Sequence, residues 1–499
     1  MRNLLLLTAF FFMSLIFAQA PAIVWQKNYG GTSYEYAKCI KQTADGGFVV
    51  AGYTASVNGD VSSNHGGSDF WILKLNASGD IVWQKTYGGT GNDVAESIAQ
   101  TTDGGYIVAG STNSIDGDVI NYTNGSTDFW VIKIDSVGTL QWQSCEGGSY
   151  SDRACSVVQT TDGGCIVVGN IDSTATYDDY LIIKYNSIGT IQWFKIYGSG
   201  GYDFAKSVQQ TTDGGYIVAG YSTGGVGNHG SYDIWILKLS STGTIQWQKC
   251  LGGSLDETAY DVKQTNDGKF IITGQTNSYD GNVTNYHGSV DIWVVLLNSD
   301  GTIQWQKTLG GTDSDISSSV VQTSDNGFLI SGYVRSSNGD VTNYHGNDDG
   351  WLAKLSSTGV LEWQRTMGGS MFDYAYSAIQ ATDGSYVLVG SSQSSDGDIA
   401  FNHGSDDLLI VKFQGSSMNN SEQNSSPPMT LFPNPSHSKL NISASADVSF
   451  DSIKVIDVHG AVLFEPKNFP VDVEPLASGF YFLEVTSGGT TQHLKFLKK

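Results

Sequence analysis

Residues 93–148 read DVAESIAQTTDGGYIVAGSTNSIDGDVINYTNGSTDFWVIKIDSVGTLQWQSCEGG. Helical periodicity is absent, and four short apolar or alternating runs are separated by turn-forming residues. Asp103 and Gly104 predict a two-residue hairpin turn, because both positions tolerate positive φ. The run that follows Asp128 is apolar at nearly every position, as in a strand covered on both faces. The expected strands are Val94–Thr101, Tyr106–Ala109, Phe129–Ile134 and Leu140–Cys145.

This unit recurs seven times along the chain. One marker is a tryptophan, at Trp25, Trp83, Trp142, Trp193, Trp247, Trp305 and Trp363. A second is an aspartate that opens an apolar strand, at Asp69, Asp128, Asp179, Asp233, Asp291, Asp349 and Asp407. Four antiparallel strands repeated about every 55 residues predict the blades of a β-propeller.

Counting strands predicts how the ring closes. Seven sets of three strands begin near residues 34, 93, 152, 203, 257, 315 and 373. Only six of these sets are followed by their own tryptophan strand, and the seventh such strand is the first one in the chain, Ile23–Tyr29. We therefore predict an all-β, seven-bladed propeller in which Ile23–Tyr29 completes the last blade beside residues 373–413. An open solenoid is the alternative, but it would need distinct capping repeats.

The repeat unit resembles a known family. Its elements are DGGYIVAG, then DFWVIKI, then a W-Q-K-x-Y-G-G segment, and over residues 23–413 they resemble the SBBP-type bacterial β-propeller repeats. This resemblance implies a fold and leaves the activity open.

The two ends of the chain predict export. Residues 1–18 have the basic start and apolar run of a signal peptide, residues 19–417 form the propeller, and residues 418–428 are a polar linker. Residues 429–499 predict a small β-sandwich that resembles the type A C-terminal sorting domain of the type IX secretion system. The matching residues are Pro433, Asn434, Pro435, Gly460, Gly479, Tyr481, Lys498 and Lys499. The resemblance implies the type IX machinery as a partner, and secretion or surface display in a Gram-negative diderm bacterium.

Charge excludes several classes of partner. The net charge is −23, and residues 21–417 carry 19 positive and 41 negative side chains. Such a chain lacks the basic surface that nucleic acid requires, and an anionic membrane would repel it. After signal removal no stretch is long enough to span a membrane. No cofactor is indicated. The excess of acidic residues is explained most simply by solubility, and calcium binding by oxygen-rich turns such as Asn58-Gly59-Asp60 is the alternative.

The repeats act as an internal control. A residue present in every copy serves folding, so the strand-opening aspartates and the tryptophans are expected to be structural. The recurring loop histidines predict a repeated hydrogen bond rather than a shared metal site, and they are His65, His229, His287, His345 and His403. The five cysteines are expected to be free thiols. Blade three departs most from the pattern, at Arg153, Cys155 and Cys165, with Glu146 nearby.

Loop lengths suggest a binding surface. The loops between the second and third strands are short only in blades three and four, which predicts a notch in one face of the disc. Tyr177, Tyr221, His229 and Tyr232 would line it. We expect a non-enzymatic binding or adhesion protein for a glycan or a protein ligand. The alternative is an extracellular carbohydrate-active hydrolase or lyase with its site on the propeller face.

Overall fold

The computed structural model describes residues 19–122, 126–172, 177–224, 227–415, 430–443, 450–457, 461–487 and 490–499. The expected signal peptide and linker lie outside these residues. The chain separates into two compact units, Met1–Ser417 and Met418–Lys499. Among the described residues no helix is long and apolar enough to cross a membrane.

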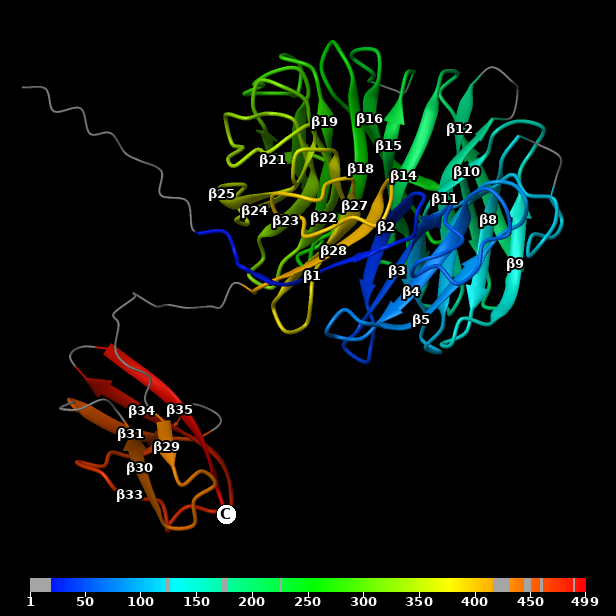
Figure 1. Ribbon diagram of the computed structural model, residues 1–499. Coiled ribbons are helices and arrows are strands. Elements are labelled where there is room, and N and C mark those ends of the chain that lie inside the picture. Colours follow the sequence, from blue (N-terminus) through cyan, green and yellow to red (C-terminus); the bar gives the residue numbers. More distant parts are fainter. Residues whose placement is uncertain are drawn as a thin grey trace, which may run out of the picture. The chain divides into compact units, whose positions relative to one another are not determined.

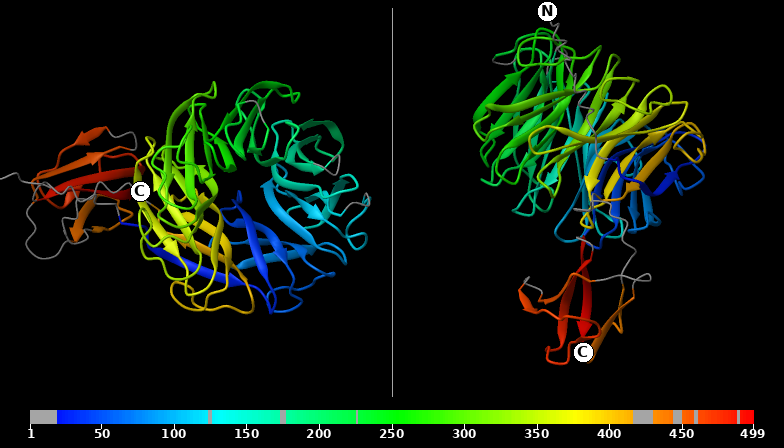
Figure 2. Two further views of the ribbon diagram at one scale, coloured as in Figure 1. Left: turned by 90° about the horizontal axis from the view of Figure 1, so that it is seen from above. Right: turned by 90° about the vertical axis from the view of Figure 1, so that its left-hand side faces the viewer.

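The first unit is a ring of seven four-stranded antiparallel sheets (Figure 1; Figure 2, left). Blade one is β2 (Glu35–Gln42), β3 (Phe48–Thr54), β4 (Asp69–Leu75) and β5 (Ile81–Tyr87); blade two is β6 (Asp93–Gln100), β7 (Tyr106–Thr112), β8 (Asp128–Ile134) and β9 (Leu140–Glu146). Blade three is β10 (Arg153–Gln159), β11 (Cys165–Asp172), β12 (Asp178–Tyr185) and β13 (Ile191–Tyr197); blade four is β14 (Asp203–Gln210), β15 (Tyr216–Ser222), β16 (Asp233–Leu239) and β17 (Ile245–Leu251). Blade five is β18 (Glu257–Gln264), β19 (Phe270–Thr276), β20 (Asp291–Leu297) and β21 (Ile303–Leu309); blade six is β22 (Asp315–Gln322), β23 (Phe328–Val334), β24 (Asp349–Leu355) and β25 (Leu361–Met367).

Blade seven confirms the predicted closure. It consists of β26 (Asp373–Gln380), β27 (Tyr386–Ser392), β28 (Asp407–Phe413) and the first strand of the chain, β1 (Ile23–Tyr29). β1 pairs antiparallel with β28, from Trp25 opposite Lys412 to Tyr29 opposite Leu408. β28 is therefore paired on both sides, and the seventh blade has four strands like the other six.

The hairpin between the first two strands differs from the two-residue turn that we expected. In blade two, Gln100 pairs with Tyr106, and the Thr101 N–H donates to the Gly105 carbonyl over 2.8 Å. The turn therefore spans three residues, with Gly104 at its last position and a φ of 84°. This loop places the positive φ on glycine alone, so Asp103 is free to bind the buried Lys133 ammonium, 3.1 Å away.

One hydrogen bond joins each blade to the next in the same way. The glutamine that ends the first strand of a blade accepts the N–H of a turn residue in the preceding blade. These glutamines are Gln42, Gln100, Gln159, Gln210, Gln264, Gln322 and Gln380. The bond from the Thr382 N–H to Gln42, at 2.8 Å, closes the series between blades seven and one.

Buried carboxylates also meet at the blade junctions. Asp69 and Asp93 are fully buried, and a Cβ added to Gly88 would lie 2.5 Å from Asp69 Oδ1 and 2.4 Å from Asp93 Oδ2. The two carboxylates thus face each other across the Cα of a glycine. Four other junctions repeat the arrangement, with Asp407 and Glu35 at Gly30, Asp128 and Asp152 at Gly147, Asp233 and Glu257 at Gly252, and Asp349 and Asp373 at Gly368. Burial raises the pKa of Asp152 and of Asp349 to about 6.

The second unit is the expected β-sandwich. One sheet holds β29 (Thr430–Phe432), β30 (Lys439–Ser443) and β33 (Val471–Asp472). The other holds β32 (Val462–Phe464), β31 (Ser452–Ile456), β34 (Gly479–Ser487) and β35 (Thr490–Lys498). Leu440, Val455, Leu483 and Phe496 are fully buried in the core of this unit.

The closure predicts that β1 is essential for stability. Deleting residues 19–29 should lower the unfolding temperature by about 10 °C or more, because β28 loses its partner and becomes an open edge. Val24 is 54% exposed on the same strand, so Val24→Ser serves as the control and should change the unfolding temperature little. Differential scanning calorimetry measures both. An unchanged transition in the deletion variant would contradict the closed ring.

The buried carboxylates predict a propeller that becomes more stable as the pH falls from 7 to 5. The pKa values of Asp152 and Asp349 are higher in the folded state than the ordinary 3.8, so the folded protein binds protons more tightly than the unfolded chain within this range. We expect a rise in unfolding temperature of about 3 °C. Below about pH 4 the gain should reverse, because Asp103 and Asp213, whose pKa values their hydrogen bonds and lysine partners lower to about 2, begin to lose their ion pairs.

A single substitution tests the cause of this pH dependence. Asp349→Asn would keep an oxygen for the His345 N–H, 2.7 Å away, and turn an amide N–H toward Asp373. The variant should therefore unfold at a higher temperature than the native protein at pH 7, and its stability should depend less on pH. A lower stability at pH 7, or an unchanged pH dependence, would refute the assignment.

Candidate functional site

The innermost strands of the blades surround an axial channel with two chambers. We call the chamber with a volume of about 880 Å³ the upper chamber, and the chamber with a volume of about 270 Å³ the lower chamber. The upper chamber lies within the usual size range of ligand pockets. Seven side chains, one from each blade, line both chambers and so form a waist between them. The waist residues are Lys38, Glu96, Cys155, Lys206, Tyr260, Ser318 and Tyr376.

A β-bulge in each innermost strand sets the position of the waist. The register between the first and second strands shifts in all seven blades, for example between Ala37 and Cys39 and between Ala205 and Ser207. Each waist residue is the extra residue of such a bulge. Bulges re-aim side chains and are frequent beside functional sites. After the bulge, Ile40 is fully buried between blades and Lys41 lines the lower chamber, which is the reverse of strict alternation.

The waist is a repeated position at which the seven blades place unlike chemistry. The neighbouring residue before the bulge is alanine in six copies and serine in the seventh, whereas the waist itself holds lysine, glutamate, cysteine, tyrosine and serine. The repeated small residue before the bulge indicates a constraint from folding. The variation at the waist position, which faces the channel, indicates a role other than folding. This variation is visible in the sequence once the bulge is known, and sequence reasoning alone missed it.

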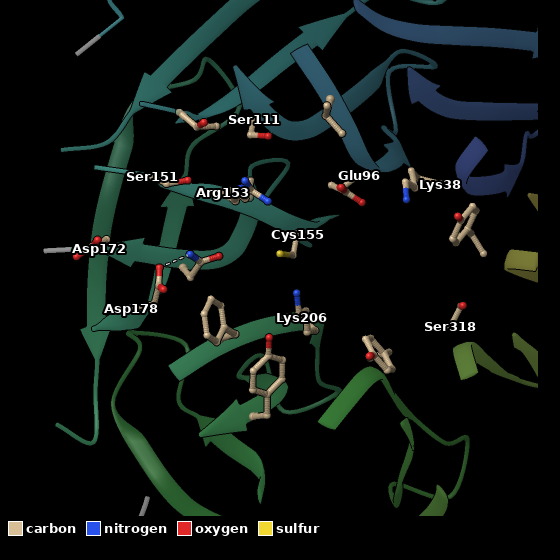
Figure 3. Close-up of a pocket in the computed structure, with 18 of the residues that line it drawn as sticks. Lys38, Glu96, Ser111, Ser151, Arg153, Cys155, Asp172, Asp178, Lys206 and Ser318 are labelled. Carbon is tan, nitrogen blue, oxygen red and sulfur yellow. Dashed lines mark hydrogen bonds between the residues drawn. The ribbon is translucent and has the colours of Figure 1, made fainter. Parts of the chain in front are cut away.

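Two lysines at the waist are held by aromatic rings. Lys38 Nζ lies 4.1 Å from the centroid of the Tyr376 ring and 5.7 Å from that of Tyr36. Lys206 Nζ lies 5.9 Å from Phe204 and 5.7 Å from Tyr221. Figure 3 shows Lys38, Glu96, Cys155 and Lys206 pointing into the same space. Neither lysine forms an ion pair with another described residue, so cation–π contacts hold both ammonium groups in the channel.

The wall of the upper chamber is uneven. On the side of blades six, seven and one, tyrosines pack in a continuous series through Tyr333, Tyr374, Tyr376, Tyr36 and Tyr53. On the side of blades two and three the equivalent positions hold smaller or polar side chains, among them Val94, Ser111, Arg153 and Asn170. The upper chamber opens toward blades two and three, because these residues leave room that tyrosine rings fill on the side of blades six, seven and one.

Of the four residues predicted to line a notch, Tyr221 is the one found in the lining of the upper chamber. Burial raises the pKa of Tyr221 to about 12. Tyr232 packs edge-on against Tyr221, with 5.4 Å between ring centroids, and Tyr177 packs in the same way against Tyr202, at 5.1 Å. His229 contacts Asp233 through Nδ1 at 3.1 Å and so supports the loop. Whether these residues bind a ligand stays a prediction.

Blade three contributes two of its three unusual residues to the channel. Arg153 and Cys155 line the upper chamber. Cys165 is fully buried in β11, and Glu146 ends the outer strand β9, so neither belongs to the site. All five cysteines are free, as expected. Burial raises the pKa of Cys155, and the proximity of Cys155 raises that of Lys206, which keeps this ammonium charged.

The repeated histidines take the structural role predicted for them. The Nδ1 atoms of all five lie within 2.6–3.1 Å of the strand-opening aspartates, whose carboxylates also accept the histidine backbone N–H. Asn58 Oδ1 and Asp60 Oδ2, the turn oxygens considered for calcium, accept the N–H groups of Thr32 and Gly30. The described residues contain no group of three or more histidine, cysteine, aspartate or glutamate side chains able to hold a metal. Calcium binding stays an untested expectation.

The sorting-motif residues of the tail come together at the end of β35. The Leu497 N–H donates to Asn434 Oδ1, and Asn434 Nδ2 donates to the Lys495 carbonyl, both over 3.0 Å. Gly479 pairs with Lys498 at the start of β34, and the Lys499 N–H donates to the Ser436 carbonyl. Tyr481 donates its hydroxyl to the Ala477 carbonyl, and Gly460 lies outside the described residues.

Comparison with known families bears on this tail. Residues 430–499 match the secretion system C-terminal sorting domain. The tail is a sorting domain. It implies export through the type IX secretion system to the cell surface or beyond, as expected from its motifs.

The whole chain has more distant relatives. It is 22% identical over 398 residues to the regulatory protein FlaEY of Caulobacter vibrioides, which covers 69% of this chain and 41% of that protein. It spans less than half the length of the curated relatives that it matches. Among solved structures, puromycin hydrolase is similar with 8% identity and a TM-score of 0.46, over 94% of this chain and 62% of that one. YCF48 bound to D1 peptide is similar with 8% identity and a TM-score of 0.39, over 79% and 96%.

The channel predicts that Cys155 is the thiol that reacts in the folded protein. Iodoacetamide should alkylate Cys155 in the native state and reach the buried Cys39, Cys145, Cys165 and Cys250 only after denaturation. Since burial raises the pKa of Cys155, labelling should be several-fold faster at pH 9 than at pH 7. Peptide mass spectrometry locates the label, and Cys155→Ser is the control. Native labelling of Cys165 instead would contradict the geometry of the channel.

Proposed function

We propose that this chain is an exported binding protein that takes a glycan into the upper chamber of its propeller and acts in recognition or adhesion outside the cell. Its repeats belong, in this proposal, to the SBBP type that the sequence resembles. The sorting domain accounts for delivery, and the propeller supplies a rigid frame. No step of catalysis is required for this role.

The observation that carries the proposal is the waist of unlike side chains beside an 880 Å³ chamber, in a molecule whose blades are otherwise repeated. Aromatic faces such as those of Tyr221 and Tyr333 suit the apolar faces of sugar rings. Asn92, Asn113 and Asp178, on the side of blades two and three, can exchange hydrogen bonds with sugar hydroxyls. A ligand rich in hydroxyl groups fits this lining better than an apolar one.

The notch residues extend this site in the proposal. Tyr177, Tyr202, Phe204, Tyr221 and Tyr232 form an unbroken series of ring contacts from the rim into the chamber. A glycan chain that enters the chamber would pass along these rings. His229 would act indirectly, by holding the loop that carries Tyr232.

A glycan screen on the full purified protein tests the proposal. The panel should include neutral and acidic polysaccharide fragments, with binding followed by calorimetry and by protection of Cys155 from alkylation. Tyr221→Ala should weaken binding about tenfold through the loss of ring stacking. Tyr344→Ala, on the long loop between β23 and β24 of blade six, should not weaken it. Failure of every glycan to bind would refute the proposal. Release of shortened products in the same mixtures would favour the hydrolase or lyase alternative.

A further inference from the structure

The axial channel differs in charge from the rest of the propeller. Residues 21–417 carry 19 positive and 41 negative side chains, so carboxylates outnumber cations about twofold. In the lining of the two chambers this excess of carboxylates disappears, with five cations beside four carboxylates. The cations there are Lys38, Lys41, Arg153, Lys206 and Lys263, and the carboxylates are Glu96, Asp172, Asp178 and Asp261.

Several of the channel carboxylates are already engaged. Asp261 binds Lys263 at 2.5 Å and accepts the Ser207 hydroxyl at 2.7 Å. Asp178 accepts a hydrogen bond from Asn170 Nδ2 at 2.6 Å. Glu96 is the single carboxylate among the seven waist residues. It shares the waist with Lys38 and Lys206, and Arg153 lines the upper chamber two residues before the waist residue of its own strand.

The two waist lysines and Arg153, by contrast, have no partner within ion-pair or hydrogen-bond distance among the described residues. The rings of Tyr376, Tyr36, Phe204 and Tyr221 hold the two lysines by their faces, and an aromatic face leaves the N–H groups of an ammonium available. Lys38 comes from blade one and Lys206 from blade four, and both side chains point into the space shown in Figure 3.

We propose that the waist binds the acidic group of an acidic glycan, a carboxylate or sulfate held between Lys38 and Lys206 while the sugar rings occupy the upper chamber. This inference rests on the proposed glycan-binding function and names its ligand class. Anions pair strongly with half-buried ammonium groups that have no other partner, because little competing solvation remains. Glu96 then accepts a sugar hydroxyl beside the acidic group, and Arg153 offers a further donor from above.

A pair of ligands that differ in charge tests the inference. Oligogalacturonate and its methyl ester have the same sugar rings and differ in charge. The acid should bind the full protein at least tenfold more tightly than the ester, and its affinity should fall as salt is raised. Dextran sulfate against dextran distinguishes sulfate from carboxylate in the same way. Binding is measured by calorimetry and by protection of Cys155 from alkylation.

Lysine variants locate the anion. Lys206→Met and Lys38→Met keep the stem of the side chain and remove its charge, and each should weaken binding of the acidic ligand about tenfold. Lys85→Met, on the exposed outer strand β5, is the matched control and should bind normally. The unfolding temperature of each variant confirms that it folds.

The outcomes separate this inference from the function on which it rests. Equal binding of oligogalacturonate and its ester, or normal binding by both waist variants, would overturn the anion site and leave a glycan-binding site intact. Neutral glycans that bind where no acidic one does would overturn it too. If neither class binds, the proposed function itself is wrong and the inference falls with it.

Discussion

The pairing of β1 with β28 is the contact on which the rest of the propeller depends. It joins residues almost 400 positions apart and ties the start of the propeller to its last blade, which closes the ring. Only a closed ring encloses an axis, and only an enclosed axis brings the first strands of seven blades around one channel. The chambers and the waist therefore depend on β1, a strand that precedes the first complete blade in the sequence.

The blade junctions show why the repeat has the composition it has. A pair of carboxylates buried at a junction favours protonation and destabilises the ionised state, yet five junctions keep this arrangement. Each carboxylate accepts backbone or hydroxyl hydrogen bonds, such as the Gly89 N–H and the Ser114 hydroxyl at Asp93, so the acids organise the loops around them. The first glycine of the Gly-Gly pair is required because any side chain there would collide with both carboxylates.

The same repetition separates folding from function. At positions where all blades agree, the shared residue makes the same contact in each, as the glutamines at the blade junctions do. At the waist, the blades share a bulge but not a side chain. A bulge in an innermost strand offers a position that faces the channel and carries no packing duty, and this freedom allows a glutamate, a cysteine and two lysines to sit on one ring.

The sequence by itself determined the blade count, the closure and the sorting tail, because these depend on local signals: a tryptophan or an aspartate at a fixed place in each unit, and a motif of Pro433, Asn434 and Pro435 near its expected position. It also singled out Tyr221 as a candidate ligand-binding residue, and Arg153 and Cys155 as departures from the repeat. Only the tertiary structure decided which residues face the axis. Strict alternation after Lys38 points to Ile40, but the bulge turns Ile40 into the space between blades and Lys41 into the channel. Likewise, the meeting of Asp69 with Asp93 depends on the rotation of one blade against the next, which no local pattern encodes.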